Sequence, residues 1–179
     1  MTKMSTVINP AYLLRSYAWA VLKANDPQTW DETKYGGLIP IVPVSEEPEL
    51  EEFAGPHIVY GYAMSSTSDL HARKMGSMTF AVYDQNFRRL TKTLTILEAA
   101  FERQDESAQD VNEYTSGPQN NPAIAKPFVG LRFGYIAIGF VEGGTPEETE
   151  GGRQSALLNI TFEYYVDYEL NTRPPPFVP

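Results

Sequence analysis

The sequence predicts an α+β fold: a mixed, mainly antiparallel sheet packed against two helices, with a long C-terminal β-hairpin. Three observations predict it. Apolar residues recur at helical spacing over 10–24 and 86–104. Segments with the alternating pattern of strands lie between and after these helices, and a glycine-bounded linker over 143–152 joins the last two strands. The length of 179 residues fits one domain, expected over 1–172 and followed by an extended proline-rich tail over 173–179.

The first element expected is the helix over 10–24. Asn9 is suited to cap it, and Pro10 is favoured at its first position. Its apolar face is predicted to comprise Tyr12, Leu13, Leu14, Tyr17, Ala18, Val21 and Leu22. The apolar segment 38–44 contains two prolines, which cannot donate to a sheet ladder, so it is predicted to be an edge strand or an extended arm.

Two strands are predicted next, over 57–64 and 75–83, and they are expected to pair as antiparallel neighbours. The alternation places Met78, Phe80 and Val82 on one face of the second strand. The helix over 86–104 follows, with Asp84 or Asn86 as its cap, and should lie across a sheet face. Its apolar stripe is predicted to consist of Phe87, Leu90, Leu94, Leu97 and Phe101.

The polar segment 105–127 is predicted to be a long loop, with a short helical turn near 110–114. Strands over 128–142 and 154–170 then form the hairpin, and the second strand alternates most clearly. One of its faces carries Leu158, Ile160, Phe162, Tyr164, Val166, Tyr168 and Leu170, and the other carries Asn159, Thr161, Glu163, Asp167 and Glu169. The tail favours a polyproline conformation and is either a frayed end or docked on a neighbour.

Composition excludes several kinds of chemistry. The chain has no cysteine, which rules out thiolate catalysis and disulfides, and its net charge of −9 opposes phosphate-backbone binding. His57 and His71 lack metal-ligand spacing, and no phosphate loop or nucleophile elbow is present. We therefore expect no enzyme and no catalytic, cofactor-binding or metal-binding residues. No run of apolar residues is long enough to predict a membrane span.

Three stretches together resemble a known family. An amphipathic N-terminal helix precedes Pro56-His57-Ile58-Val59-Tyr60-Gly61, and a strand-into-helix unit runs Met78-Thr-Phe-Ala-Val-Tyr-Asp-Gln-Asn-Phe-Arg-Arg-Leu. The last long strand contains Asn159-Ile-Thr-Phe-Glu-Tyr-Tyr-Val. Over most of residues 10–170 this arrangement resembles the tail-terminator, or tail-completion, proteins of long-tailed bacteriophages. The acidic segment 46–52, the segment 105–127 and the proline tail have no counterpart in the family pattern.

The resemblance implies a structural virion protein, made in the host cytoplasm and placed at the end of the tail that faces the head. Such proteins form a hexameric ring on the tail tube, stop its growth and provide the docking surface for the head–tail connector or neck protein. In contractile tails some also touch the sheath protein. DNA is expected to pass the lumen without specific binding, because a strongly acidic protein repels it.

Contacts between subunits or with partners are expected from the hairpin over 128–170 and the arm over 38–44, because free strand edges invite pairing. Arg88 and Arg89 are expected to form salt bridges with a neighbour. The predicted contact residues are Ile39, Ile41, Val42, Arg88, Arg89, Tyr135, Phe140, Tyr165 and Phe177. The alternatives are another neck or sheath-capping protein of the head–tail junction, or a small α+β binding module or hydrolase.

Overall fold

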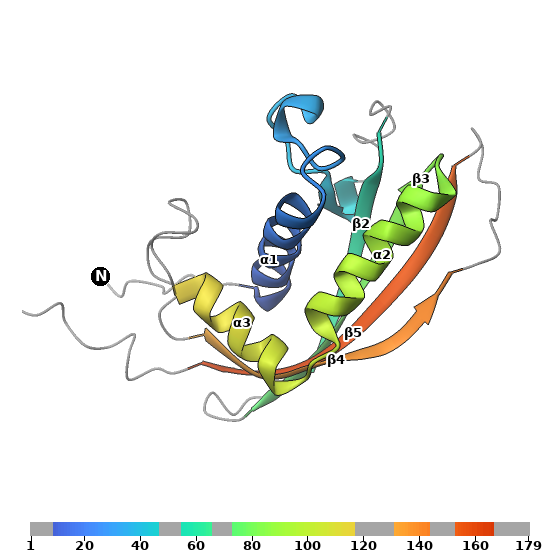
Figure 1. The fold of residues 1–179 in the computed structure, drawn as a ribbon. Helices are drawn as coiled ribbons and strands as arrows, with labels where there is room; N and C mark the ends of the chain where they lie inside the picture. Colours follow the sequence, from blue (N-terminus) through green and yellow to red (C-terminus); the bar gives the residue numbers. More distant parts are fainter. Residues whose placement is uncertain (1–8, 47–54, 66–72, 117–130, 144–152, 167–179) are drawn as a thin grey trace, which may run out of the picture.

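The structure is a computed structural model, which describes residues 9–46, 55–65, 73–116, 131–143 and 153–166. Three α-helices, one short 3₁₀-helix and five strands follow one another along these residues (Figure 1). In chain order they are α1 (Pro10–Asn25), η1 (Glu32–Tyr35), β1 (Ile41–Pro43), β2 (His57–Met64), β3 (Lys74–Asp84), α2 (Phe87–Phe101), α3 (Asp105–Ser116), β4 (Leu131–Glu142) and β5 (Gln154–Val166).

The five strands form one sheet in the order β1-β2-β3-β5-β4. Only β1 and β2 run parallel, and all other neighbours are antiparallel, which confirms the mixed, mainly antiparallel sheet. The predicted hairpin is confirmed as the β4–β5 pair, but β4 forms the edge and β5 lies inside the sheet. At the opposite edge, the segment 38–44 contributes the three-residue strand β1, as predicted for an edge strand.

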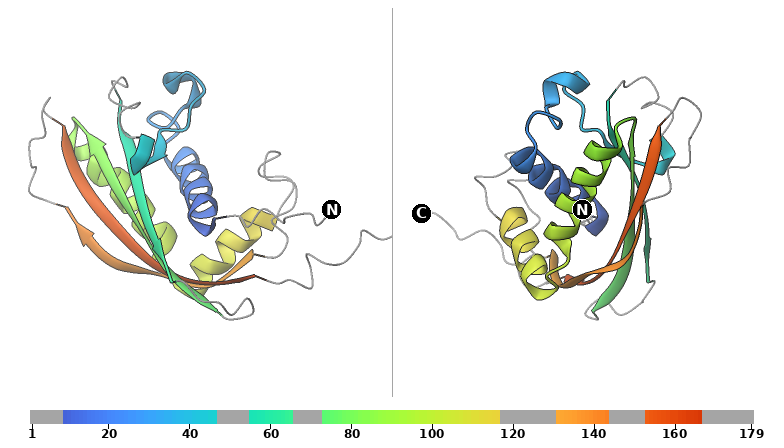
Figure 2. Two further views of the ribbon diagram at one scale, coloured as in Figure 1. Left: turned by 180° about the vertical axis from the view of Figure 1, so that it is seen from behind. Right: turned by 45° about the vertical axis from the view of Figure 1, so that its right-hand side comes forward.

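All three helices lie on one side of the strongly bent sheet (Figures 1 and 2). The core fills the space between the two layers. The sheet contributes the predicted faces of β3 and β5, including Met78, Phe80, Ile160 and Phe162, all fully buried. Burying each such side chain stabilises the fold by roughly 1.5–3 kcal/mol. The α+β class is therefore confirmed, although the sheet packs against three helices and not two.

Helix α1 begins as its cap predicts. The Asn9 side chain accepts a hydrogen bond of 2.9 Å from the Ala11 N–H, and Pro10 occupies the first helical position. Leu13, Leu14, Ala18 and Leu22 are fully buried against the core. Tyr12 differs from the predicted apolar face because its side chain is 44% exposed.

Helix α2 is capped by Asn86, whose side chain accepts a 3.0 Å hydrogen bond from the Arg89 N–H. The predicted stripe is buried at Leu90, Leu94, Leu97 and Phe101. Phe87 is a correction, since its side chain is 48% exposed. Side chains of a helix tilt toward its N terminus, so the side chain of this first residue projects beyond the turns that cover the sheet.

The expected loop over 105–127 is wrong in its described half, because residues Asp105–Ser116 form α3, which includes and extends the helical turn expected near 110–114. Ala108, Val111 and Thr115 are buried at helical spacing, which gives this polar segment a narrow packed stripe. The Asn112 side chain fixes the helix to β4 by accepting from the Phe133 N–H and donating to the Phe133 carbonyl, both at 2.8 Å. This pairing replaces a strand neighbour that β4 lacks on its outer side among the described residues.

Candidate interaction surface

The sheet side that faces away from the helices has no described element packed across it (Figure 2). The strand register places its residues in rows that cross the sheet. The two central rows are Gly61, Thr79, Asn159 and Phe140, and Ala63, Ser77, Thr161 and Ala137. We call these eight residues the open face. They are uncharged and mostly small, so another protein surface can approach the backbone closely without desolvating an ion.

Asn159 organises the centre of the open face. Its side-chain amide donates a 2.9 Å hydrogen bond to the Thr79 hydroxyl on β3. On the other side of Asn159, β4 has a register shift between Ile138 and Phe140, where Gly139 is the extra residue. A Cβ at Gly139 would lie 2.2 Å from the Asn159 Oδ1, so only glycine fits there without a shift of the side chain.

This irregularity presents Phe140 at the border of the open face, with 48% of its side chain exposed. Val141 beside it is also exposed. Both lie on β4, a 12-residue edge strand whose outer side has no strand neighbour within the described ranges. Exposed edges of this kind are available for contacts with another chain, and the two register shifts of β4 restrict regular strand addition to short stretches.

Charged and aromatic side chains flank one end of the open face. Arg73 donates a 2.9 Å hydrogen bond to the Glu163 carboxylate, and Tyr135 lies opposite Glu163 in the register. Tyr165 lies opposite Arg132 in the next row, and both tyrosines are partly buried. The structure thus brings Tyr135, Phe140 and Tyr165 to the same side of the sheet.

His57 lies on the same side of the sheet, at the opposite end. Its buried ring stacks on Tyr83, with 5.1 Å between the ring centroids. Burial, aided by the positive charge of Arg153, lowers the pKa of His57 from 6.5 to about 4. The imidazole is therefore neutral near pH 7. Because it packs between neighbouring strands, His57 has a structural role.

The contact residues predicted in the arm lie mainly inside the molecule. Ile41 is a correction: its side chain is fully buried in the core, where no neighbour can reach it. Ile39 packs partly buried against the same core, and Val42 is half-buried. The parallel pairing of β1 with β2 explains this, because it turns Ile41 toward the helices next to Ile58.

The two arginines of α2 differ in what they contact. Arg88 is exposed and forms no ion pair with another described residue. Arg89 is bound within its own chain, since its Nε and Nη2 atoms lie 2.6 and 2.7 Å from the two carboxylate oxygens of Asp84. The salt bridge expected for Arg89 with a neighbouring subunit is thus formed within the chain. Phe177 lies outside the described residues.

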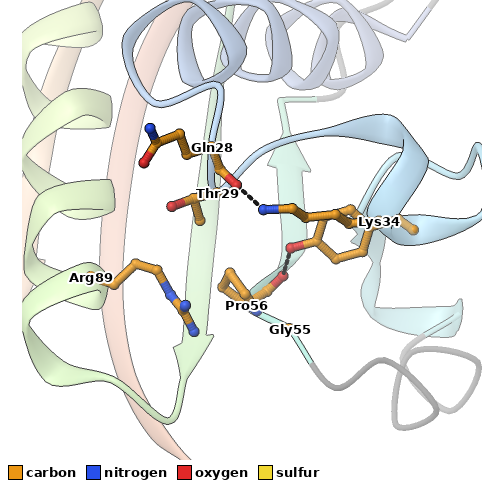
Figure 3. A pocket seen from close by; sticks show the side chains of 7 residues that line it. Gln28, Thr29, Lys34, Gly55, Pro56 and Arg89 are labelled. Carbon is orange, nitrogen blue, oxygen red and sulfur yellow. Dashed lines mark hydrogen bonds between the residues drawn. The ribbon is translucent and has the colours of Figure 1, made fainter.

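A polar hollow of about 510 Å³ opens on the helix side of the sheet (Figure 3). It is lined by Gln28, Thr29, Lys34, Tyr35, Gly55, Pro56 and Arg89. Lys34 donates to the Gln28 carbonyl, and the Tyr35 hydroxyl donates to the Pro56 carbonyl at 2.7 Å. Burial raises the pKa of Tyr35. Lys34, Tyr35 and Arg89 each bind another part of the same chain, so these three ionisable groups serve to join segments of the fold.

The sequence contains a signal for the open face. The centres of the second faces of 75–83 and 154–170 hold small uncharged residues, among them Thr79 and Thr161. Within the described ranges, no three His, Asp or Glu side chains gather as they would around a metal ion. The helices described are all too short or too polar to cross a membrane.

Comparison of the sequence with protein-family models and with curated proteins finds no match.

Proposed function

We propose that this protein is a structural component of the head–tail junction of a long-tailed bacteriophage. Copies of the chain form a hexameric ring that caps the tail tube, ends its polymerisation and carries the head–tail connector. The proposal joins two kinds of support. One is the sequence resemblance to tail-terminator proteins over residues 10–170, and the other is the surface that the fold leaves uncovered.

The open face with Phe140 at its border is the observation that carries the proposal. A sheet of this size presents small uncharged side chains at its centre and a half-exposed aromatic ring at its edge. Large exposed apolar side chains beside an uncharged surface are typical of protein contacts. A head-to-tail contact of this kind closes into a ring when its rotation permits.

The charge of the chain suits the passage of DNA through such a ring. The net charge is −9, and the open face itself contains no ionisable residue. The acidic side chains therefore lie on surfaces other than the proposed contact. A lumen lined by them repels the phosphate backbone and keeps the DNA from adhering.

The test uses the full chain together with isolated tail tubes. We expect light scattering to give a hexamer, electron microscopy to show six-fold rings, and added protein to stop tube growth. A chain that stays monomeric at micromolar concentration and leaves tube growth unchanged would contradict the proposal. Rings that never bind tubes would contradict tube capping and support the alternative of another neck or sheath-capping protein.

A matched pair of variants locates the contact. Phe140→Glu places a carboxylate on the open face, and Phe87→Glu places one at the start of α2, on the helix side. Both phenylalanines are 48% exposed, so the two changes cost similar amounts in the monomer. We expect only Phe140→Glu to abolish the ring. Equal loss in both variants would remove the open face as the contact.

A further inference from the structure

Strand β2 presents Tyr60 and Tyr62 on the helix side of the sheet, and Tyr12 lies in the first turn of α1. Tyr12 and Tyr62 are 44% and 50% exposed, whereas Tyr60 is buried. The rings of Tyr60 and Tyr62 are nearly parallel, with centroids 6.4 Å apart and 28° between their planes. We call Tyr12, Tyr60 and Tyr62 the tyrosine surface. Aromatic rings exposed side by side offer flat apolar area together with hydroxyl donors.

Two charged side chains lie beside the tyrosine surface. The Arg15 guanidinium is stacked 5.6 Å from the Tyr12 ring centre, and its Nε donates to the Ile41 carbonyl at 2.6 Å. Glu46, just after β1, is exposed. Burial raises the pKa of the Tyr60 hydroxyl, the charge of Arg15 lowers it and that of Glu46 raises it further.

The neighbouring sheet edge has no strand to complete it. Strand β1 pairs with only Ile58, Val59 and Tyr60, and the chain then turns away in a helical turn over 44–46. The outer side of β2 beyond Tyr60 therefore has no paired strand within the described ranges. An extended segment fits this position, because it lies along the edge and across the tyrosine rings.

The chain itself contains a segment with the matching chemistry. Residues 173–179 read Arg-Pro-Pro-Pro-Phe-Val-Pro, in which Pro176 and Pro179 fall on the same side of a three-residue polyproline turn. Proline-rich segments dock on aromatic surfaces with little loss of conformational entropy. Proline carbonyls accept hydrogen bonds while proline offers no N–H, and the tyrosine hydroxyls with Arg15 supply donors. Arg173 can pair with Glu46.

The end of β5 lies within reach of the tyrosine surface. The Tyr164 hydroxyl contacts the Met64 sulfur at 3.4 Å, so side chains from the ends of β5 and β2 meet across β3 on the helix side. Tyr62 is level with Ile160 two strands away, which puts it about 22 Å from Val166 by sheet spacing. The seven Cα–Cα steps from Val166 to Arg173 span about 24 Å when extended.

We propose that residues 173–179 fold back in the same chain and dock as a polyproline segment on Tyr12, Tyr60 and Tyr62, with Arg173 paired to Glu46. The tail is thus an internal strap that covers the free end of the β2 edge. This proposal is independent of the ring and of any phage role.

The absence of cysteine from the sequence permits a direct test in the full chain. A nitroxide on the introduced cysteine of Val178→Cys relaxes nearby protons, and NMR intensities report which residues it approaches. We expect Tyr12 and Tyr62 to lose most of their intensity, while Gln104, at the junction of α2 and α3, keeps its own. If the signals of the tyrosines show no selective loss of intensity, the proposal is overturned.

Controls separate this docking from other occupants. Changing Pro174, Pro175 and Pro176 together to serine in the labelled chain should restore the tyrosine signals, and signals that stay quenched would refute polyproline docking. Diluting labelled chains into isotope-enriched, unlabelled chains should leave the signals intact, and quenching there would assign the surface to the tail of a second copy. A nitroxide on Thr2→Cys should not quench Tyr12 and Tyr62 more strongly than the Val178 label, and if it does the occupant is the N-terminal segment.

Discussion

Replacing Arg89 by methionine should destabilise the joint between the end of β3 and the start of α2. The Asp84 side chain at this joint is only 1% exposed. Its carboxylate accepts from the Arg89 Nε and Nη2 atoms at 2.6 and 2.7 Å, and from the Asn86 N–H at 2.9 Å. Methionine keeps the apolar stem of the arginine but removes the guanidinium, so the buried carboxylate loses its counter-ion and two of these hydrogen bonds.

The expected loss follows from how far each partner is buried. An exposed ion pair contributes roughly 0.2–1 kcal/mol, whereas breaking a fully buried pair costs roughly 3–5 kcal/mol. Asp84 is buried but the Arg89 side chain is 37% exposed, so water can partly replace the guanidinium. We therefore expect a loss of about 2–3 kcal/mol in the free energy of unfolding. For a chain of this length, that lowers Tm by about 4–12 °C.

Urea denaturation of the wild type, Arg89→Met and the matched control Arg88→Met measures this loss. Arg88 is exposed and unpaired among the described residues, so its replacement should change stability by less than about 0.5 kcal/mol. Adding Asp84→Asn to Arg89→Met should recover part of the loss, because a neutral amide is cheaper to bury than a carboxylate. If Arg89→Met and Arg88→Met unfold at the same urea concentration, the reasoning is refuted.

Two further predictions concern buried positions of the sheet. Because the pKa of His57 is about 4 in the fold and 6.5 in the unfolded chain, the unfolded chain binds the extra proton as pH falls from 6.5 to 4, and stability decreases. His57→Gln should reduce that decrease by about 3 kcal/mol in urea titrations at several pH values. Parallel curves for the wild type and His57→Gln would contradict the assignment. Gly76→Ala should cost about 1–3 kcal/mol, because its Cβ would lie 2.5 Å from the buried Phe162 ring. Gly61→Ala, with nothing within 4 Å of the new Cβ, should be nearly neutral, and equal effects of the two changes would disprove this account of the packing.

Local signals in the sequence were sufficient for most elements. The ends of α1 were predicted to within one residue, from the cap at Asn9, the proline after it and the turn at Asp26. Alternation predicted β3 and its buried face, and the same pattern predicted β5 over the described part of 154–170. These signals succeed because capping and face periodicity depend on residues close in sequence.

Two of the wrong predictions, a loop in place of α3 and an exposed Ile41, share a cause. Helix α3 has a narrow stripe of small buried residues, so its stability depends on Asn112 binding β4 and not on a wide apolar face. The burial of Ile41 depends on which strand β1 joins and in which direction. Both outcomes come from partners distant in the chain, and no local pattern encodes them.

The candidate surface shows the same division. The sequence by itself determined two strands whose second faces hold uncharged residues at their centres, an acidic chain, and a proline-rich segment with one arginine. Only the tertiary structure decided that all helices cover the same side (Figure 2), that β5 lies between β3 and β4, and that the ring of Tyr62 lies beside that of Tyr60. The physical reason is that a strand's two faces are fixed by its own alternation, whereas which face is covered is fixed by packing between elements far apart in the chain.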